Sequence, residues 1–317
     1  MDEVPGISVV ICAYTEDRWT EIVAAVASVT EQIPPAREMI LVIDHNPELL
    51  ARASEELAGA VVVPNVQTSG LAGARNSGAL ASSGEVVAFL DDDAEARPGW
   101  IGEMQRGYVD PRVLGVGGAI DPLWPGTRPP WFPEEFHWVV GCTYRGMPLE
   151  AAPVRNLIGA NMSVRREVFD AVNGFRRELG RLEETEFCIR TSVMFPERHW
   201  LFWPHARVGH RVSGERATWR YFRRRCSAEG FAKATMVQLT TTRSGLASER
   251  LYVLRALPAG VLQGIGDALR GDPWGAVRAG AIVAGLLFTA TGYARGRIKV
   301  LRAGSDSPSL PRRGNAP

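Results

Sequence analysis

The sequence has few cysteines and no recognisable export signal. Its four cysteines (Cys12, Cys142, Cys188 and Cys226) lie far apart and form no CxxC pair. A zinc site or a disulfide framework is therefore not expected, and a reducing compartment fits. Residues 1–6 are acidic and contain neither the basic nor the apolar segment of a secretory signal. We therefore expect the folded part of the chain to stay in the cytoplasm.

The chain also lacks a large net charge. Its 36 Lys and Arg residues are balanced by 35 Asp and Glu residues, and a formal charge of +1 indicates no nucleic-acid partner. Arginine is nevertheless concentrated between residues 207 and 225, and the segment after residue 243 carries far more Arg than acid. This asymmetry favours an anionic ligand or surface, such as phosphates or acidic lipid headgroups. A solvated helix face is the alternative explanation.

Apolar runs and helical segments alternate regularly in the first hundred residues. Buried strands are predicted at 7–13, 39–43, 60–63 and 86–90, and helices at 20–32, 48–57 and 71–82. This order predicts an α/β fold with a mostly parallel central sheet and helices on both faces. Ligands of such folds bind beyond the carboxyl ends of the strands, which is where Asp44 and the Asp91–Asp93 triplet lie.

The pattern loosens after about residue 115. Residues 121–145 are rich in Pro and Trp and are expected to form a long, partly irregular excursion over the sheet. Further helices are predicted at 167–172, 183–194, 218–234, 251–269 and 276–294, and the last two form a C-terminal helical appendage. Residues 305–317 are expected to be disordered.

The acidic triplet Asp91-Asp92-Asp93 directly follows a predicted strand. Three neighbouring carboxylates repel one another unless a cation holds them, and a hard divalent ion such as Mg²⁺ or Mn²⁺ would do so. Such an ion could bridge to the phosphates of a nucleotide. A water-exposed acidic turn is the alternative, and the position at the end of a strand favours the metal.

Three further features could carry chemistry. The glycine-rich segment 70–78 opens a helix with Arg75 one turn in, which suits a diphosphate, although close helix packing would also explain the glycines. Glu183 and Glu184 lie in the first turn of a predicted helix, where Glu184 could act as a general base or the acids could simply stabilise the helix dipole. His210 is either structural or an additional metal ligand.

Taken in order, these motifs resemble those of the family 2 glycosyltransferases, which are inverting enzymes with the Rossmann-like GT-A fold. The likeness runs from about residue 7 to residue 235. It rests on the opening strand 7–14, on Leu41–Asp44, on the segment 70–78, on Phe89–Ala94, on Gly159–Ser163 with Gly174-Phe175, and on Glu183–Glu186. Within the family, the sequence is most similar to actinobacterial members of the glucosyl-dolichyl-phosphate glucuronosyltransferase type.

The resemblance implies a role for each matching residue. Ala13, Tyr14 and Asp44 would hold the base and ribose of the nucleotide, and Arg75 would lie along the donor. Asp91 and Asp92 would also contact the donor. The metal ligands would be Asp93, Asp91 and His210, and the base would be Glu184, with Glu183 as the fallback.

Two residues depart from the family's pattern. Thr15 stands where the family usually has Asn, and Glu184 stands where it usually has Asp, which moves the carboxylate by about one methylene group. The QxxRW signature of processive synthases is absent, so transfer of a single sugar is expected.

The resemblance also implies a division of the chain and a set of partners. Residues 1–115 would form the nucleotide-sugar half of the GT-A domain, 116–242 its acceptor half, 243–304 C-terminal helices that could associate with a membrane, and 305–317 a disordered tail. The expected partners are a nucleotide-sugar donor (a UDP-sugar is favoured), a glycan or polyprenyl-linked acceptor, and the inner face of the cell membrane. The alternatives are a non-catalytic carbohydrate-binding or scaffold protein, and a sugar-1-phosphate nucleotidyltransferase. The latter would need a basic glycine-rich loop that residues 13–18 do not provide.

Two apolar segments allow two interpretations each. The aromatic segment 131–138 is either an acceptor wall or packing over the sheet. The stretch 279–294 is apolar for about sixteen residues, which is below the ~20 residues needed to span a bilayer. It is therefore either a core helix or an interfacial or re-entrant anchor, followed by Arg295, Arg297, Lys299 and Arg302.

Overall fold

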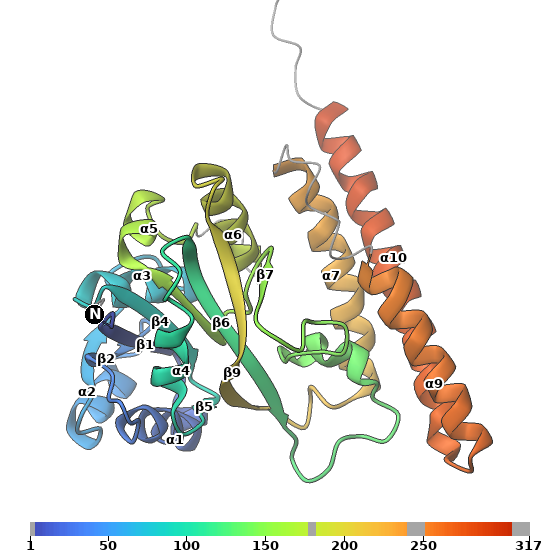
Figure 1. The fold of residues 1–317 in the computed structure, drawn as a ribbon, viewed down its shortest axis with the longest axis horizontal. Helices are drawn as coiled ribbons and strands as arrows, with labels where there is room; N and C mark the ends of the chain where they lie inside the picture. The colour runs from blue at the N-terminus through green and yellow to red at the C-terminus, as the bar shows by residue number, and fades with distance from the viewer. Residues whose placement is uncertain (1–3, 177–181, 240–250, 306–317) are drawn as a thin grey trace, which may run out of the picture.

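A nine-stranded sheet forms the centre of the molecule (Figure 1). The fold is given by a computed structural model, which describes residues 4–176, 182–239 and 251–305. The strand order is β3-β2-β1-β4-β8-β6-β9-β5, and β7 pairs with β9. The strands are β1 (Ile7–Ala13), β2 (Glu38–Ile43), β3 (Val61–Pro64), β4 (Val86–Asp91), β5 (Ala94–Ala96), β6 (Val113–Leu123), β7 (Ala152–Val154), β8 (Asn161–Arg165) and β9 (His199–Arg211).

The first four strands form the predicted parallel sheet. β1 pairs in parallel with β2 and β4, and β2 pairs in parallel with β3. Cys12 lies opposite Asp91 and Ala13 opposite Ile43, so the carboxyl ends of these strands meet at one edge. Three helices connect these strands: α1 (Trp19–Thr30), α2 (Pro47–Glu56) and α3 (Leu71–Ala81). Their ends lie within two residues of the predicted bounds. A short 3-10 turn, η1 (Glu16–Arg18), precedes α1.

The remaining strands make the sheet mixed. β8 runs antiparallel to both β4 and β6, β6 pairs in parallel with β9, and β5 and β7 run antiparallel to β9. These later strands were not predicted. The segment 121–145 is partly irregular, as expected; β6 extends into it as far as Leu123, and the 3-10 segment η2 spans Glu134–Val140.

Helices cover both faces of the sheet, as predicted. Alternate residues of β1 point to opposite faces, so that Val9 and Ile11 join one core and Val10 joins the other. The first core includes side chains of α1, α2 and α4 (Trp100–Arg106). The second includes side chains of α3, α5 (Arg166–Ala171) and α6 (Glu183–Met194). The sheet is therefore buried on both sides, and its strand ends are the open route to a ligand.

The C-terminal segments form a separate layer beside β7 and η2 (Figure 1). It consists of α7 (Trp219–Leu239), the π-helical turn η5 (Tyr252–Ala256), α9 (Leu257–Leu269) and α10 (Pro273–Ser305). α7 and α10 approach closely, because a Cβ at Gly230 would collide with the carbonyl of Thr289 and one at Gly292 with the carbonyl of Ser227. These glycines allow backbone-to-backbone packing that a larger residue would prevent. Residues 243–250 and 306–317 lie outside the described residues.

The expected length of the last helix was wrong. α10 continues well beyond residue 294, and residues 273–302 form a 30-residue helical stretch with a mean hydropathy of 1.4 in its most apolar window. By length and composition alone, this stretch could cross a membrane. A third of that window, 33%, is buried against the rest of the protein, and core helices of soluble proteins can pass the same test.

Candidate active site

Asp44 is held at the end of β2 by a shell of donors. Its carboxylate accepts hydrogen bonds from Asn65 Nδ2 at 2.6 Å, from the backbone N–H of Gly70 at 2.8 Å and from Ser69 Oγ at 3.2 Å, and it contacts His45 Nδ1 at 2.8 Å. Burial opposes ionisation, but these hydrogen bonds outweigh it and lower the pKa of Asp44. The carboxylate is therefore fixed and charged beside the start of α3.

Pairing between β5 and β9 brings the acidic triplet to His210. Ala94 lies opposite His210 in the ladder, and His210 Nε2 is 3.1 Å from Asp93 Oδ1. One ligand atom from each of Asp91, Asp93 and His210 lies within 4.8 Å of the other two. Two carboxylates and an imidazole form a donor set that suits Mn²⁺, and Mg²⁺ also accepts the carboxylates.

Arginine and histidine side chains lie against the acidic triplet. Arg18 Nη1 lies 2.8 Å from Asp92 and 3.4 Å from Asp93, and Arg216 Nη1 lies 3.8 Å from Asp93. Burial still raises the pKa of Asp92 to about 7 against the pull of Arg18, and Asp92 Oδ2 is buried without a hydrogen-bond partner among the described residues. Burial disfavours charge on His210 as well, but the hydrogen bond to Asp93 raises its pKa to about 10. A metal ion bound by His210 would therefore have to displace a proton from the imidazole, because only the neutral ring can be a ligand.

Arg75 joins the acidic triplet to the two glutamates of α6. The side chain is almost completely buried; Nη1 lies 3.0 Å from both Glu183 and Glu184, and Nη2 lies 3.1 Å from Asp91. Gly159 covers this contact, and a Cβ there would collide with both Glu184 and Arg75. The arginine is thus placed to orient the carboxylate of Glu184.

The two glutamates differ in their environment. The side chain of Glu184 is 21% exposed, whereas that of Glu183 is only 6% exposed. Burial raises the pKa of Glu183 to about 7, although Arg75 opposes this effect. Glu184 is therefore the more accessible of the two carboxylates.

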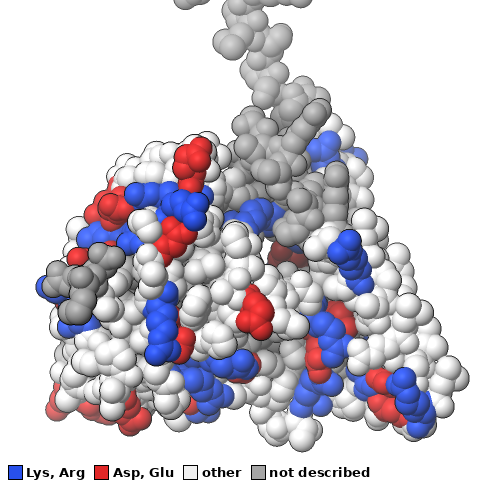
Figure 2. All heavy atoms as spheres, in the orientation of Figure 1, with Lys and Arg blue, Asp and Glu red and all other residues white. Residues whose placement is uncertain are grey.

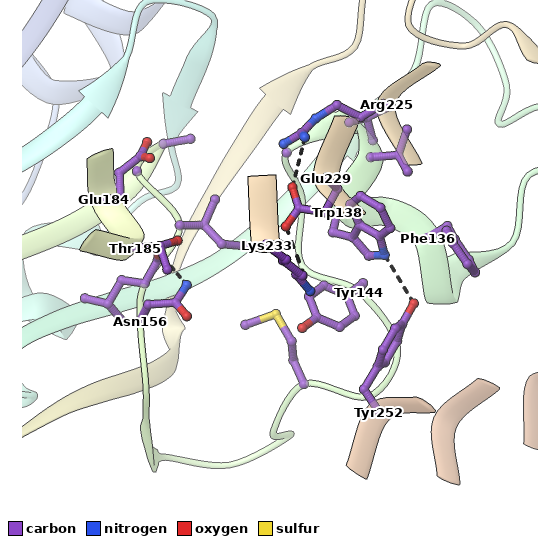
Figure 3. Close-up of a pocket in the computed structure, with 18 of the residues that line it drawn as sticks. Phe136, Trp138, Tyr144, Asn156, Glu184, Thr185, Arg225, Glu229, Lys233 and Tyr252 are labelled. Atoms are coloured by element: carbon purple, nitrogen blue, oxygen red, sulfur yellow. Dashed lines mark hydrogen bonds and ion pairs between the residues drawn. The ribbon is translucent and has the colours of Figure 1, made fainter. Parts of the chain in front are cut away.

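Two pockets meet at the metal-ligand cluster. The smaller has a volume of about 360 Å³ and is lined by Ala13, Tyr14, Arg18, Asp44 and Asp92, among others. The larger, of about 920 Å³, includes Glu183 and Glu184 and is drawn in Figure 3. Both pockets are lined by Leu71, Asp91, His210 and Arg216. A molecule in one pocket could therefore meet a molecule in the other beside the Asp91–His210 cluster.

The structure brings together every residue singled out from the sequence. Ala13, Tyr14, Asp44, Asp91, Asp92 and Asp93 line the smaller pocket, Glu183 and Glu184 line the larger one, His210 lies in both, and Arg75 is buried between Asp91 and the glutamates. The roles assigned to them remain predictions.

One part of the aromatic segment 131–138 packs against a helix, and another part lines the larger pocket. Trp131 and Phe132 pack against Phe222 of α7, with ring centroids 5.7 and 5.5 Å apart. Phe136 and Trp138 line the larger pocket, and Trp138 Nε1 donates a hydrogen bond to Tyr252 Oη at 3.1 Å (Figure 3).

Sequence reasoning did not identify several residues that line the two pockets. These are Arg18, Asn156, Thr185, Arg216, Arg225, Glu229, Lys233 and Tyr252. The concentration of arginine between residues 207 and 225 was the one available signal for Arg216 and Arg225. The other residues come from segments that only the tertiary structure brings together.

Comparisons with known proteins identify the family of this chain. The sequence profile of Glycosyl transferase family 2 matches residues 8–172. A glucosyl-dolichyl phosphate glucuronosyltransferase of Haloferax volcanii is 34% identical over 241 residues, which cover 73% of this chain and 77% of that protein. A pre-mycofactocin glycosyltransferase of Mycobacterium tuberculosis is 30% identical over 130 residues, 41% of this chain and 28% of that protein.

A solved structure supports the same fold. The mannosyltransferase from Pyrobaculum calidifontis, in complex with GDP-Man and Mn²⁺, superposes with a TM-score of 0.56 at 16% identity, covering 91% of this chain and 88% of that one. At this identity the likeness concerns the GT-A fold alone. The profile match and the Haloferax relative together show that this chain is a glycosyltransferase and belongs to glycosyl transferase family 2.

Proposed function

We propose that this enzyme transfers a single sugar from a nucleoside-diphosphate sugar to a hydroxyl of a lipid-linked acceptor, with inversion at the anomeric carbon and with a divalent metal ion. The supporting observation is that the two pockets meet at Asp91 and His210, with the accessible carboxylate of Glu184 in the larger pocket. The family assignment leaves no reason to prefer a nucleotidyltransferase or a non-catalytic scaffold.

The smaller pocket is the proposed donor site. The ionised, hydrogen-bonded carboxylate of Asp44 is suited to accept hydrogen bonds from a ribose or a nucleobase, and Tyr14 offers a half-exposed ring beside it. A UDP-sugar remains our favoured donor, while the solved mannosyltransferase with a similar fold was crystallised with GDP-Man. Arg18 and Arg216 lie where they could contact a diphosphate.

Asp91, Asp93 and His210 would hold the metal ion, Mn²⁺ or Mg²⁺. When bound, the ion would neutralise the negative charge that develops on the departing diphosphate. Burial would raise the pKa of Asp93, but the hydrogen bond from His210 lowers it. The Asp93 carboxylate would therefore be ionised and able to bind a cation.

Glu184 is the proposed general base. In the reaction, the acceptor oxygen forms a bond to the anomeric carbon as the bond from that carbon to the diphosphate breaks, and Glu184 takes the hydroxyl proton. Attack on the face of the anomeric carbon opposite the departing diphosphate would invert the anomeric configuration. Arg75, at 3.0 Å, would orient the carboxylate of Glu184 for this transfer.

The C-terminal helices would bring the site to a membrane. Exposed apolar side chains recur along η5, α9 and α10, where polar residues would be expected on a solvated surface. They are Leu254 on η5, Leu262, Ile265 and Leu269 on α9, and Trp274, Val277, Val283, Leu287, Ile298 and Leu301 on α10. Figure 2 shows mostly uncharged surface over these helices, interrupted by separate Lys and Arg side chains and by mixed charges at the lower right, near the turn between α9 and α10. We propose that this surface contacts the lipid on the cytoplasmic face.

Turnover of nucleotide sugars tests the proposed function. The full-length chain is incubated with Mn²⁺, a panel of nucleotide sugars and short-chain polyprenyl-phosphate-linked sugars, and the glycosylated lipid is detected by mass spectrometry. We expect metal-dependent formation of a product with one added sugar. Metal-independent transfer would contradict the proposed role of Asp91, Asp93 and His210, and addition of several sugars would contradict single transfer.

A further inference from the structure

One wall of the larger pocket is charged. α7 places Arg225, Glu229 and Lys233 at intervals of four residues, so their side chains form a row along one helix face. Arg225 Nη1 lies 2.9 Å from Glu229 Oε2, and Lys233 Nζ lies 3.9 Å from Glu229 Oε1 (Figure 3). All three side chains are partly buried. This row, which we call the α7 charge row, carries a net charge of +1.

Stability does not explain why the α7 charge row faces a pocket. Ion pairs between residues four apart on an exposed helix contribute about 0.3–0.5 kcal/mol each, and partial burial adds a desolvation cost. Apolar side chains of Val253, Leu257 and Leu286, from η5, α9 and α10, line the same pocket. A charged row beside such walls suits a ligand that has both a charge and an apolar part.

The other acids of the pocket already have cationic partners. Arg75 contacts Glu183, Glu184 and Asp91, whereas the single carboxylate of Glu229 faces both Arg225 and Lys233. Arg225 and Lys233 thus flank one carboxylate, and Arg155 and Arg216 add two further cationic side chains to the lining of the same pocket. An anionic group is the ligand chemistry that these cations can stabilise.

We infer that Arg225 and Lys233 bind the phosphate that joins the acceptor's sugar to its lipid. This inference rests on the proposed function of the same pocket. A lipid-linked sugar consists of a hydroxyl-bearing ring, a phosphate and an apolar chain, and the pocket offers a wall for each: Glu184, the α7 charge row, and the apolar side chains of α9 and α10. Figure 3 shows the row between Glu184 and Tyr252 in that view.

Glu229 contributes to the proposed phosphate site without binding the phosphate itself. Glu229 would hold the two cations in place before the ligand arrives, which reduces the entropy lost on binding. Arg225 and Lys233 are thus specificity residues for the acceptor.

Binding of farnesyl phosphate to the full-length protein in a non-ionic detergent tests this inference. Titration calorimetry compares the wild type with Arg225→Gln, Lys233→Gln and the double variant. The matched control is Arg223→Gln, which removes the same charge from an exposed position of the same helix, outside the set of residues that line the pocket. Farnesol supplies the apolar chain without the phosphate, inorganic phosphate supplies the anion without the chain, and UDP with Mn²⁺ reports on the donor site.

We expect the double variant to bind farnesyl phosphate about tenfold more weakly or worse, since hydrogen bonds to charged groups contribute at least that factor. Arg223→Gln should bind it like the wild type, and binding of farnesol and UDP should change in none of the variants. Lys233 is the more exposed of the two residues, so its single variant reports on the site even if Arg225→Gln destabilises the fold.

Three results would overturn the inference. These are unchanged farnesyl phosphate binding in the double variant, an equal loss of farnesol binding, or inorganic phosphate binding as tightly as farnesyl phosphate. Failure of the proposed function would look different: the wild type would turn over no nucleotide sugar with any acceptor while the charge dependence of farnesyl phosphate binding remained.

Discussion

The donor-side and acceptor-side pockets differ in how the chain builds them. The smaller pocket is formed mainly by loops that directly follow β1, β2 and β4, so its residues come from a few short segments. The larger pocket collects side chains from η2, α6, α7, η5, α9 and α10, which lie far apart in the sequence. The smaller pocket, our proposed donor site, is thus formed by the sheet, whereas most of the larger pocket, our proposed acceptor site, is formed by helices packed beside the sheet.

The largest effect should come from the proposed metal-ligand cluster, at which the two pockets meet. Replacing Asp93 by Ala removes a proposed metal ligand, and we expect turnover to fall roughly 10³-fold or more, because charge on the leaving group is no longer neutralised. Product formation at saturating Mn²⁺ measures this loss. Asp110→Ala, which changes a carboxylate on the surface, is the control, and a loss below tenfold in Asp93→Ala would show that the two pockets do not share a metal.

A change confined to the acceptor side should spare the donor. Glu184→Gln is expected to lower turnover about 10²- to 10³-fold through loss of the general base, with the affinity for the nucleotide unchanged. Steady-state kinetics and a separate titration with UDP and Mn²⁺ distinguish the two effects. Glu183→Gln is the matched variant one position away; if it proved the more damaging, the base would be Glu183.

The apolar surface of the C-terminal helices should affect location more than chemistry. Leu262 and Leu269 are 70% and 84% exposed, and exchanging either for Glu should weaken binding to anionic lipid vesicles about tenfold or more, through lost apolar burial and added negative charge. Vesicle co-sedimentation measures this. Leu80→Glu changes a leucine that is 74% exposed on α3, and it should bind vesicles like the wild type. Equal weakening in both would refute a specific membrane surface.

The smallest effect concerns stability and pH. The pKa of Glu183 is raised to about 7 in the folded state, above its ordinary value of 4.5, so the folded protein binds more protons and loses stability as pH rises between these values. Glu183→Gln avoids that loss but gives up the ion pair with Arg75. We therefore expect it to gain about 1 kcal/mol relative to the wild type between pH 4.5 and 7. Urea denaturation at both pH values checks this, and a constant difference would contradict it.

The difference between the two pockets also explains which site residues could be predicted from the sequence. Asp44 and Asp91 follow apolar strands whose order fixes where their ends meet, so their proximity was predictable. His210 depends on the pairing of β5 with β9, and β9 was not predicted. Glycines interrupt the apolar pattern of β6; Gly118 is needed there because a Cβ would collide with the carbonyl of Ala206. Close tertiary packing thus hid these strands.

The acceptor pocket was the least predictable part of the site. Arg225 and Lys233 look like ordinary charges on an amphipathic helix until α7 is placed against α9 and α10. The length of α10 was underestimated because only its most apolar stretch was counted, whereas the helix continues through the basic residues that follow. Local patterns carry no information on which helix face meets a cavity.

The close packing at Gly230 has a mechanical consequence. One face of α7 carries the α7 charge row, and an adjacent face lies directly on the backbone of α10 at Thr289, with no side chain between them to absorb a shift. A tilt or displacement of α10 would therefore be transmitted to Arg225 and Lys233 with little damping. If the C-terminal helices contact lipid as proposed, the properties of that lipid would then affect the width of the larger pocket.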